Sequence, residues 1–216
     1  MYLEAGSLDP ANKRRTSMPF TLAILAALFS WTWYFEQHAP TRAVAIVGAI
    51  VIALTIWHNA RRRAWGFDWR AFWPGLRRVL IVTLPVVALT VAAGAALDTL
   101  HDRRDFLGSL SALAWWGLAQ QWVLQTVVLA EAQQWTSRRA GIWIAAAIFG
   151  AIHLPNPFLS AVTFLGGLLW CRIYDRYPNI LPLALSHGLG TLAILYAFDA
   201  DVTGRLRIGL SYLQLR

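Results

Sequence analysis

The stretch "LAWWGLAQQWVLQTVVLA", residues 113–130, contains three glutamines but no charged side chain. An uncharged, mainly apolar run of about 18 residues or more is typical of a helix that crosses a membrane. The composition of the whole chain agrees, because 57% of its 216 residues are hydrophobic and only 14% are charged, unlike the usual composition of soluble domains. We therefore expect an all-α, polytopic integral membrane protein built as a helical bundle.

The apolar segments predict about seven transmembrane helices, each close to the roughly 20 residues that a bilayer crossing requires. They lie at residues 19–35, 42–59, 79–98, 106–132, 140–155, 158–174 and 180–198. The first segment lacks a small-residue cleavage site after its apolar run, so we expect it to be retained. The one cysteine, Cys171, is interpreted as a packed core residue. No repeat or linker divides the chain, which predicts a single membrane domain over residues 1–216.

The distribution of Lys and Arg predicts the orientation in the membrane. With a cytoplasmic N-terminus, thirteen of the 19 basic residues fall on the cytoplasmic side. We therefore expect the N-terminus in the cytoplasm and the C-terminus outside, in a bacterial cytoplasmic membrane. Anionic headgroups account for the net charge of +8 without a nucleic-acid partner. Residues 61–78, "RRRAWGFDWRAFWPGLRR", mix arginine with aromatic residues and predict an additional interfacial helix.

Polar side chains inside the predicted crossings mark a candidate site. Polar groups at membrane depth are rare and usually face the interior of the bundle, so we expect three helices to share one pocket. A simpler alternative is that the amides only join helices and that the histidines are neutral packed residues. The side chains are Gln120, Gln121 and Gln125 on the fourth crossing, His153 at the end of the fifth, and His187 and Thr191 within the seventh.

The order and spacing of these residues resemble the CAAX-protease and bacteriocin-processing family (CPBP, also called Abi) of intramembrane endopeptidases. In that family, an acidic pair with an arginine four positions after its second member precedes Phe-x-x-x-His and then His-x-x-x-small polar residue. In this chain the corresponding elements are "QQWVLQ" (120–125), "FGAIH" (149–153) and "HGLGT" (187–191). The resemblance covers about residues 106–198 and implies that the site consists of Gln120, Gln121, Gln125, His153, His187 and Thr191.

The departure from the family pattern concerns charge. The resemblance implies that the first glutamate of the family acts with the histidines on a water molecule, directly or through a metal ion. Glutamine has the same shape but cannot accept the proton, and loss of a general base typically costs about 10²–10⁴ in rate. Here both acidic positions and the arginine position are glutamines. Glu131, which lies inside the predicted fourth crossing, is expected at headgroup level, paired with Arg138 or Arg139.

Two functional interpretations follow. The first is a catalytically silent member of the family that serves as a structural or binding subunit in a membrane protein complex, in contact with lipids and other integral membrane proteins. The alternative is an active intramembrane endopeptidase with altered catalytic residues. We expect no cofactor, because two histidines without a third strong ligand form an incomplete zinc site. If a metal bound, its ligands would be His153 and His187. A transporter is disfavoured because the chain shows no internal repeat.

Overall fold

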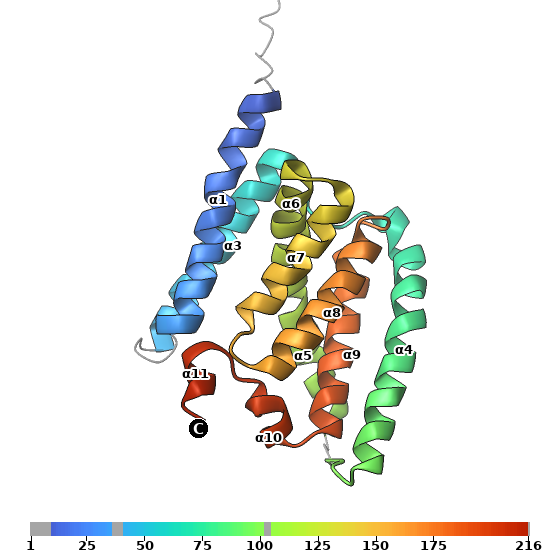
Figure 1. Ribbon diagram of the computed structural model, residues 1–216. Helices are drawn as coiled ribbons and strands as arrows, with labels where there is room; N and C mark the ends of the chain where they lie inside the picture. Colours follow the sequence, from blue (N-terminus) through green and yellow to red (C-terminus); the bar gives the residue numbers. More distant parts are fainter. Residues whose placement is uncertain (1–9, 36–40, 102–104, 216) are drawn as a thin grey trace, which may run out of the picture.

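The computed structural model describes residues 10–35, 41–101 and 105–215, which are helical almost throughout (Figure 1). No β-strand occurs in these residues, and one isolated bridge joins Phe67 to Asn179. The elements are α1 (Pro10–Ser30), the π-helix η1 (Trp31–Phe35), α3 (Thr41–Arg62), η2 (Trp69–Ala71), α4 (Phe72–Ala96), α5 (Phe106–Val123), the π-helix η3 (Leu124–Leu129), α6 (Ala130–Trp135), α7 (Arg138–Ile152), α8 (Pro157–Tyr174), α9 (Ile180–Ala197), α10 (Ala200–Thr203), η4 (Gly204–Leu206) and α11 (Gly209–Leu213).

The helices form one bundle with α9 near its centre. The most extensive helix contacts are those of α5 with α9, α7 with α8, and α4 with α9. In Figure 1, α1 and α3 lie side by side along one flank and α4 lies along the other. The short helices α10 and α11 lie beneath the lower end of the bundle in that view. The site motifs, which lie on α5, α7 and α9, are therefore in the middle of the molecule.

Glycines set the closest helix approaches. A Cβ atom added at Gly94 of α4 would lie 2.5 Å from the carbonyl oxygen of Ala197 on α9. A Cβ atom at Gly188 of α9 would lie 3.0 Å from the backbone nitrogen of Ala114 on α5. Small residues at such positions let two backbones approach closely, as in membrane bundles.

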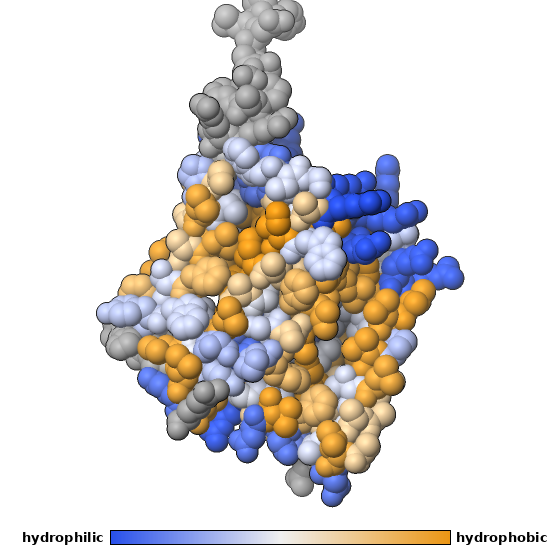
Figure 2. Space-filling model, in the orientation of Figure 1, coloured by the Kyte–Doolittle hydropathy of each residue, from blue (hydrophilic) through white to orange (hydrophobic). Residues whose placement is uncertain are grey.

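The prediction of an all-helical membrane protein is confirmed. Four helical segments are long and apolar enough to cross a membrane: Met18–Phe35, Trp69–Ala96, Pro157–Tyr174 and Ile180–Ala197. Figure 2 shows hydrophobic side chains over the middle of the visible face and hydrophilic side chains gathered toward its ends. The three other expected crossings, 42–59, 106–132 and 140–155, are helical except for a turn at residues 153–155. The count of seven crossings stays a prediction.

Residues 61–78, the segment expected to form an additional interfacial helix, are not one separate helix, and the interfacial position of this segment stays a prediction. Between Arg63 and Asp68 the chain is non-helical, and α4 already begins at Phe72 rather than at 79. The loop between α8 and α9 holds this segment extended, because Asp68 N donates to the carbonyl of Pro178 (3.0 Å) and Ile180 N donates to the carbonyl of Gly66 (2.9 Å). These backbone bonds replace those that a helix would need.

Candidate functional site

Gln121 and Gln125 bond to each other and do not line a cavity. Gln125 Nε2 donates to Gln121 Oε1 over 2.8 Å, and both side chains are fully buried. Gln125 lies in the π-helix η3, a rare geometry that often marks functional sites. Within the described residues, Gln121 Nε2 and Gln125 Oε1 have no conventional hydrogen-bond partner. The positions that resemble the family's second acidic residue and its arginine thus hold a neutral amide pair inside the bundle.

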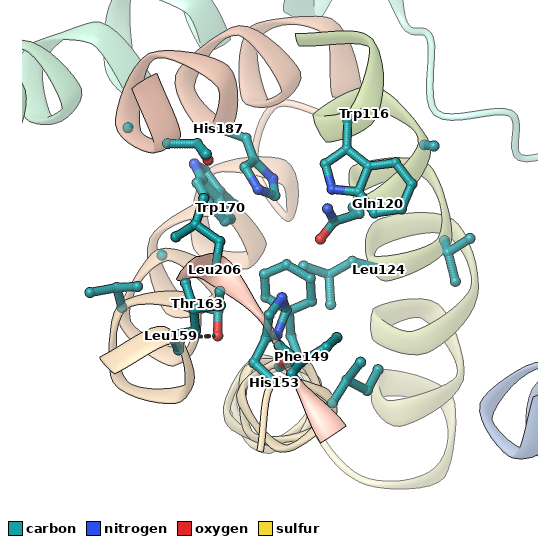
Figure 3. Close-up of a pocket in the computed structure, with 18 of the residues that line it drawn as sticks. Trp116, Gln120, Leu124, Phe149, His153, Leu159, Thr163, Trp170, His187 and Leu206 are labelled. Atoms are coloured by element: carbon teal, nitrogen blue, oxygen red, sulfur yellow. Dashed lines mark hydrogen bonds between the residues drawn. The ribbon is translucent and has the colours of Figure 1, made fainter. Parts of the chain in front are cut away.

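A cavity of about 960 Å³ occupies the middle of the bundle. Its lining comes from α1 and η1, α3, α4, α5, η3, α7, α8, α9 and the C-terminal segment. Four of the six predicted site residues line it, namely Gln120, His153, His187 and Thr191. In Figure 3, the side chains of Gln120, His153 and His187 point from three directions into one space. The structure therefore brings these residues together and leaves Gln121 and Gln125 behind Gln120.

His153 has a defined tautomer. It caps the C-terminus of α7, and its Nδ1 lies 2.7 Å from the carbonyl oxygen of Phe149. A carbonyl oxygen only accepts, so Nδ1 must carry the proton. In the neutral ring Nε2 is then an acceptor. The Phe149 ring also meets the His153 ring edge-on, with centroids 5.0 Å apart. The Phe-x-x-x-His element thus fixes both the position and the proton of this imidazole.

His187 is held by residues that the motif did not indicate. Its ring stacks on Trp170 with centroids 4.7 Å apart and an interplanar angle of 14°. Trp170 Nε1 donates to Ser186 Oγ over 3.0 Å, and Ser186 Oγ lies 2.6 Å from Thr83 Oγ1. Ser186 could have been selected from the sequence as a candidate site residue, because it is a polar residue directly before the motif histidine His187. No sequence motif marked Trp170 of α8 as a site residue.

One ring nitrogen of His187 is buried and, within the described chain, unpaired. The residue is only 7% exposed, and its Nδ1 has no hydrogen-bond partner among the described residues. Buried polar side-chain atoms are usually paired, so such an exception requires an explanation. The side chain of Gln120, half-buried on the facing helix, likewise makes no hydrogen bond to another described residue. The polar groups of the cavity are therefore free to bind a molecule that enters it.

The donors do not fit a zinc ion. Catalytic zinc sites use three protein ligands, drawn from His, Cys and carboxylates. The described residues contain no group of three or more His, Cys, Asp or Glu side chains that could hold a metal. The cavity offers two imidazoles and a neutral amide, which do not complete such a ligand set.

The expected pairing of Glu131 is wrong. Glu131 is 4% exposed and forms ion pairs with Arg62 and with His58, whose Nε2 lies 3.2 Å from Glu131 Oε1. Arg138 instead binds Asp175, with Nε 2.7 Å from Oδ1, and this hydrogen bond raises the pKa of the Arg138 guanidinium. Glu131 does not line the cavity. It therefore supplies no replacement carboxylate to the site.

Comparison with known proteins gives an independent line of support. Residues 102–193 match the family described as type II CAAX prenyl endopeptidase Rce1-like. No curated protein and no solved structure matches the chain. The matched segment includes all three motif elements, from Gln120 on α5 to Thr191 on α9. The segment from residue 102 to residue 193, which supplies both histidines of the cavity, is therefore similar to the CAAX-protease family.

Proposed function

We propose that this chain is a non-hydrolytic member of the CAAX-protease family that acts as a binding or structural subunit within the membrane. The observation that carries the proposal is the amide of Gln120, which faces the cavity beside His153 and His187 where the family has a carboxylate. A carboxylate can take a proton from water and pass it on at neutral pH. An amide cannot.

The other described residues that line the cavity do not supply the missing carboxylate. Among the described residues that line it there is no Asp, Glu, Lys or Arg. An imidazolium formed on His153 or His187 would thus have no counter-charge in an apolar cavity, and isolated charges in such surroundings are strongly disfavoured. The neutral Gln121–Gln125 pair keeps the helix packed without the charges that catalysis requires.

The proposed role in a complex is supported by the outer surface of the bundle. The indole side chains of Trp115 and Trp143 are exposed on α5 and α7, with relative exposures of 72% and 60%. Tryptophan is enriched where proteins meet other proteins. Large aromatic side chains on the membrane-facing surface suit lateral contacts with other integral membrane proteins.

An active endopeptidase with altered chemistry is the alternative, and one observation favours it. His153 Nε2 is an acceptor that could take a proton, and it faces the same space as His187. Histidine is the commonest general base in enzymes. A direct assay separates the two functions.

The experiment measures cleavage of prenylated and leader-type peptides by the purified chain in lipid bilayers. The unmodified chain and the Gln120→Glu, Gln121→Glu, Gln125→Arg triple variant are compared, with the metal content of both determined. A family protease with an intact acidic pair serves as the positive control. We expect no cleavage by the unmodified chain. Cleavage that disappears in His153→Ala and His187→Ala would overturn the proposal and establish the alternative.

A further inference from the structure

We infer that the central cavity is a binding site for an uncharged long-chain lipid with a hydroxyl head group. The inference rests on the proposed function, since the ligand is held in the site and not cleaved. It is carried by three features of the cavity: its apolar wall, the satisfied state of most of its hydroxyl groups, and the free polar atoms of Gln120, His153 and His187.

The wall of the cavity selects an apolar and uncharged ligand. Its volume of about 960 Å³ is near the upper end of the roughly 300–1,000 Å³ that small-molecule sites occupy. Valine, leucine, isoleucine and aromatic side chains make up most of its lining, and none of the described lining residues is charged. A carboxylate or ammonium head group would therefore lose its hydration without gaining a counter-ion, which is strongly unfavourable.

Most hydroxyl groups in the lining are already occupied. Thr55 Oγ1 donates to the carbonyl of Val51 over 2.7 Å, and Thr163 Oγ1 donates to the carbonyl of Leu159 over 2.6 Å. Such bonds to the preceding helical turn satisfy a threonine hydroxyl without a ligand. Thr32 and Thr90 bond in the same way, and Thr83 bonds to Ser186. These hydroxyl groups therefore leave the recognition of a head group to Gln120, His153 and His187.

The unpaired polar atoms of Gln120, His153 and His187 require a head group that can both donate and accept a hydrogen bond. His153 Nε2 is an acceptor because Nδ1 donates to the carbonyl of Phe149. Gln120 presents an amide with donor hydrogens and an acceptor oxygen. His187 Nδ1 is buried without a partner. A hydroxyl group can donate to an imidazole nitrogen and accept from the Gln120 amide at the same time. An ether or ester only accepts, so it would leave the His153 acceptor unpaired.

The experiment uses the full chain in lipid nanodiscs and a photoactivatable diazirine derivative of hexadecanol. Competitors are hexadecanol, its methyl ether, hexadecanoate and hexadecylamine. We expect hexadecanol to compete about tenfold better than the methyl ether, which corresponds to one hydrogen bond left unmade, and the two charged lipids to compete less. Crosslinks should map to cavity residues of α5, α7 and α9. Equal competition by alcohol and ether, or crosslinks confined to the outer surface, would overturn the inference.

Two variants test the roles of the polar groups by specificity and not by loss of binding alone. His153→Phe keeps a ring but removes the acceptor, so alcohol and ether should compete equally. Gln120→Glu places a carboxylate in the cavity and should shift the preference toward hexadecylamine. Gln134→Glu, on α6 and outside the cavity, is the matched control and should leave the preference unchanged. Unaltered preferences in both cavity variants would contradict the inference.

A failure of this inference can be distinguished from a failure of the proposed function. If the unmodified chain cleaves peptides, the proposed function fails whatever lipid competes for the cavity. If it cleaves nothing and the alcohol shows no preference over its ether, only the inference about the ligand fails.

Discussion

At the scale of single residues, the three glutamines of the candidate site have the shape of glutamate side chains but carry no charge. A buried ion pair requires nearly perfect pairing, because an uncompensated charge inside a protein is costly. Glutamines at residues 120, 121 and 125 avoid that requirement, and Gln125 bonds to Gln121 one turn earlier. The helix therefore retains an internal polar link at the place where the family has its acidic element.

We predict that Gln121 and Gln125 are energetically coupled. Gln121→Leu and Gln125→Leu should each lower the free energy of unfolding, by about 1–3 kcal/mol, because each leaves a buried amide unpaired. The double variant should lose less than the sum, with a coupling energy of about 0.6–2 kcal/mol. Reversible unfolding in detergent mixtures measures all three, with Gln134→Leu as a control outside the pair. Strict additivity would show that the bond contributes nothing.

At the scale of elements, a hydrogen bond joins α3 to the π-helix η3, which carries Gln125. Asn59 Nδ2 donates to Thr126 Oγ1 over 2.9 Å, and Thr126 Oγ1 donates to the carbonyl of Trp122 over 2.7 Å. One turn further, Glu131 of α6 binds His58 and Arg62 of α3. This buried network joins α3 to the segment that carries Gln125 and so supports the position of the site from outside the cavity.

The approach of α4 to α9 predicts a position-specific response to a single methyl group. Gly94→Ala would place a Cβ 2.5 Å from the carbonyl oxygen of Ala197, and such overpacking typically costs about 1–3 kcal/mol. Gly48→Ala on α3 is the matched control, since a Cβ there meets nothing within 4 Å. It should be neutral or slightly stabilising, because alanine favours a helix over glycine by up to about 1 kcal/mol. Equal stability of the two variants would show that α4 does not pack on α9 at Gly94.

At the scale of the whole molecule, basic residues concentrate at one end. The ends of α3 and α8 and the start of α7 carry Arg61, Arg62, Arg63, Arg138, Arg139 and Arg172. In Figure 1 these helix ends lie at the top of the bundle, whereas α10 and α11 lie at the bottom. Basic residues are enriched on the cytoplasmic side of membrane proteins, so this end is expected to face the cytoplasm.

Cysteine labelling tests this orientation. In a Cys171→Ser background, which removes the one native thiol, Thr136→Cys places a thiol between α6 and α7, and Asp201→Cys places one on α10. Both positions are exposed. A membrane-impermeant maleimide applied to intact cells should label the thiol at position 201 and reach position 136 only after permeabilisation. The reverse pattern would invert the proposed topology.

The sequence alone determined the helical membrane class of the protein, most of the helix positions and four residues that line the central cavity, namely Gln120, His153, His187 and Thr191. The predicted segment 158–174 differs from α8 by one residue, and His153, which lies near the end of the predicted fifth segment 140–155, is the C-cap of α7. These features could be predicted because helix-forming apolar runs, and the residues that end them, are local properties of the chain. The loss of charge at residues 120, 121 and 125 is also explicit in the sequence.

Only the tertiary structure decided which partners these residues take. Glu131 binds His58, 73 positions away along the chain, and not the nearby Arg138. The stacking of His187 on Trp170, and the extended segment at Asp68 held by the α8–α9 loop, likewise join separate parts of the sequence. Helical periodicity specifies which side chains share a face. It does not specify which face of another helix they will meet, because that depends on how the whole bundle packs.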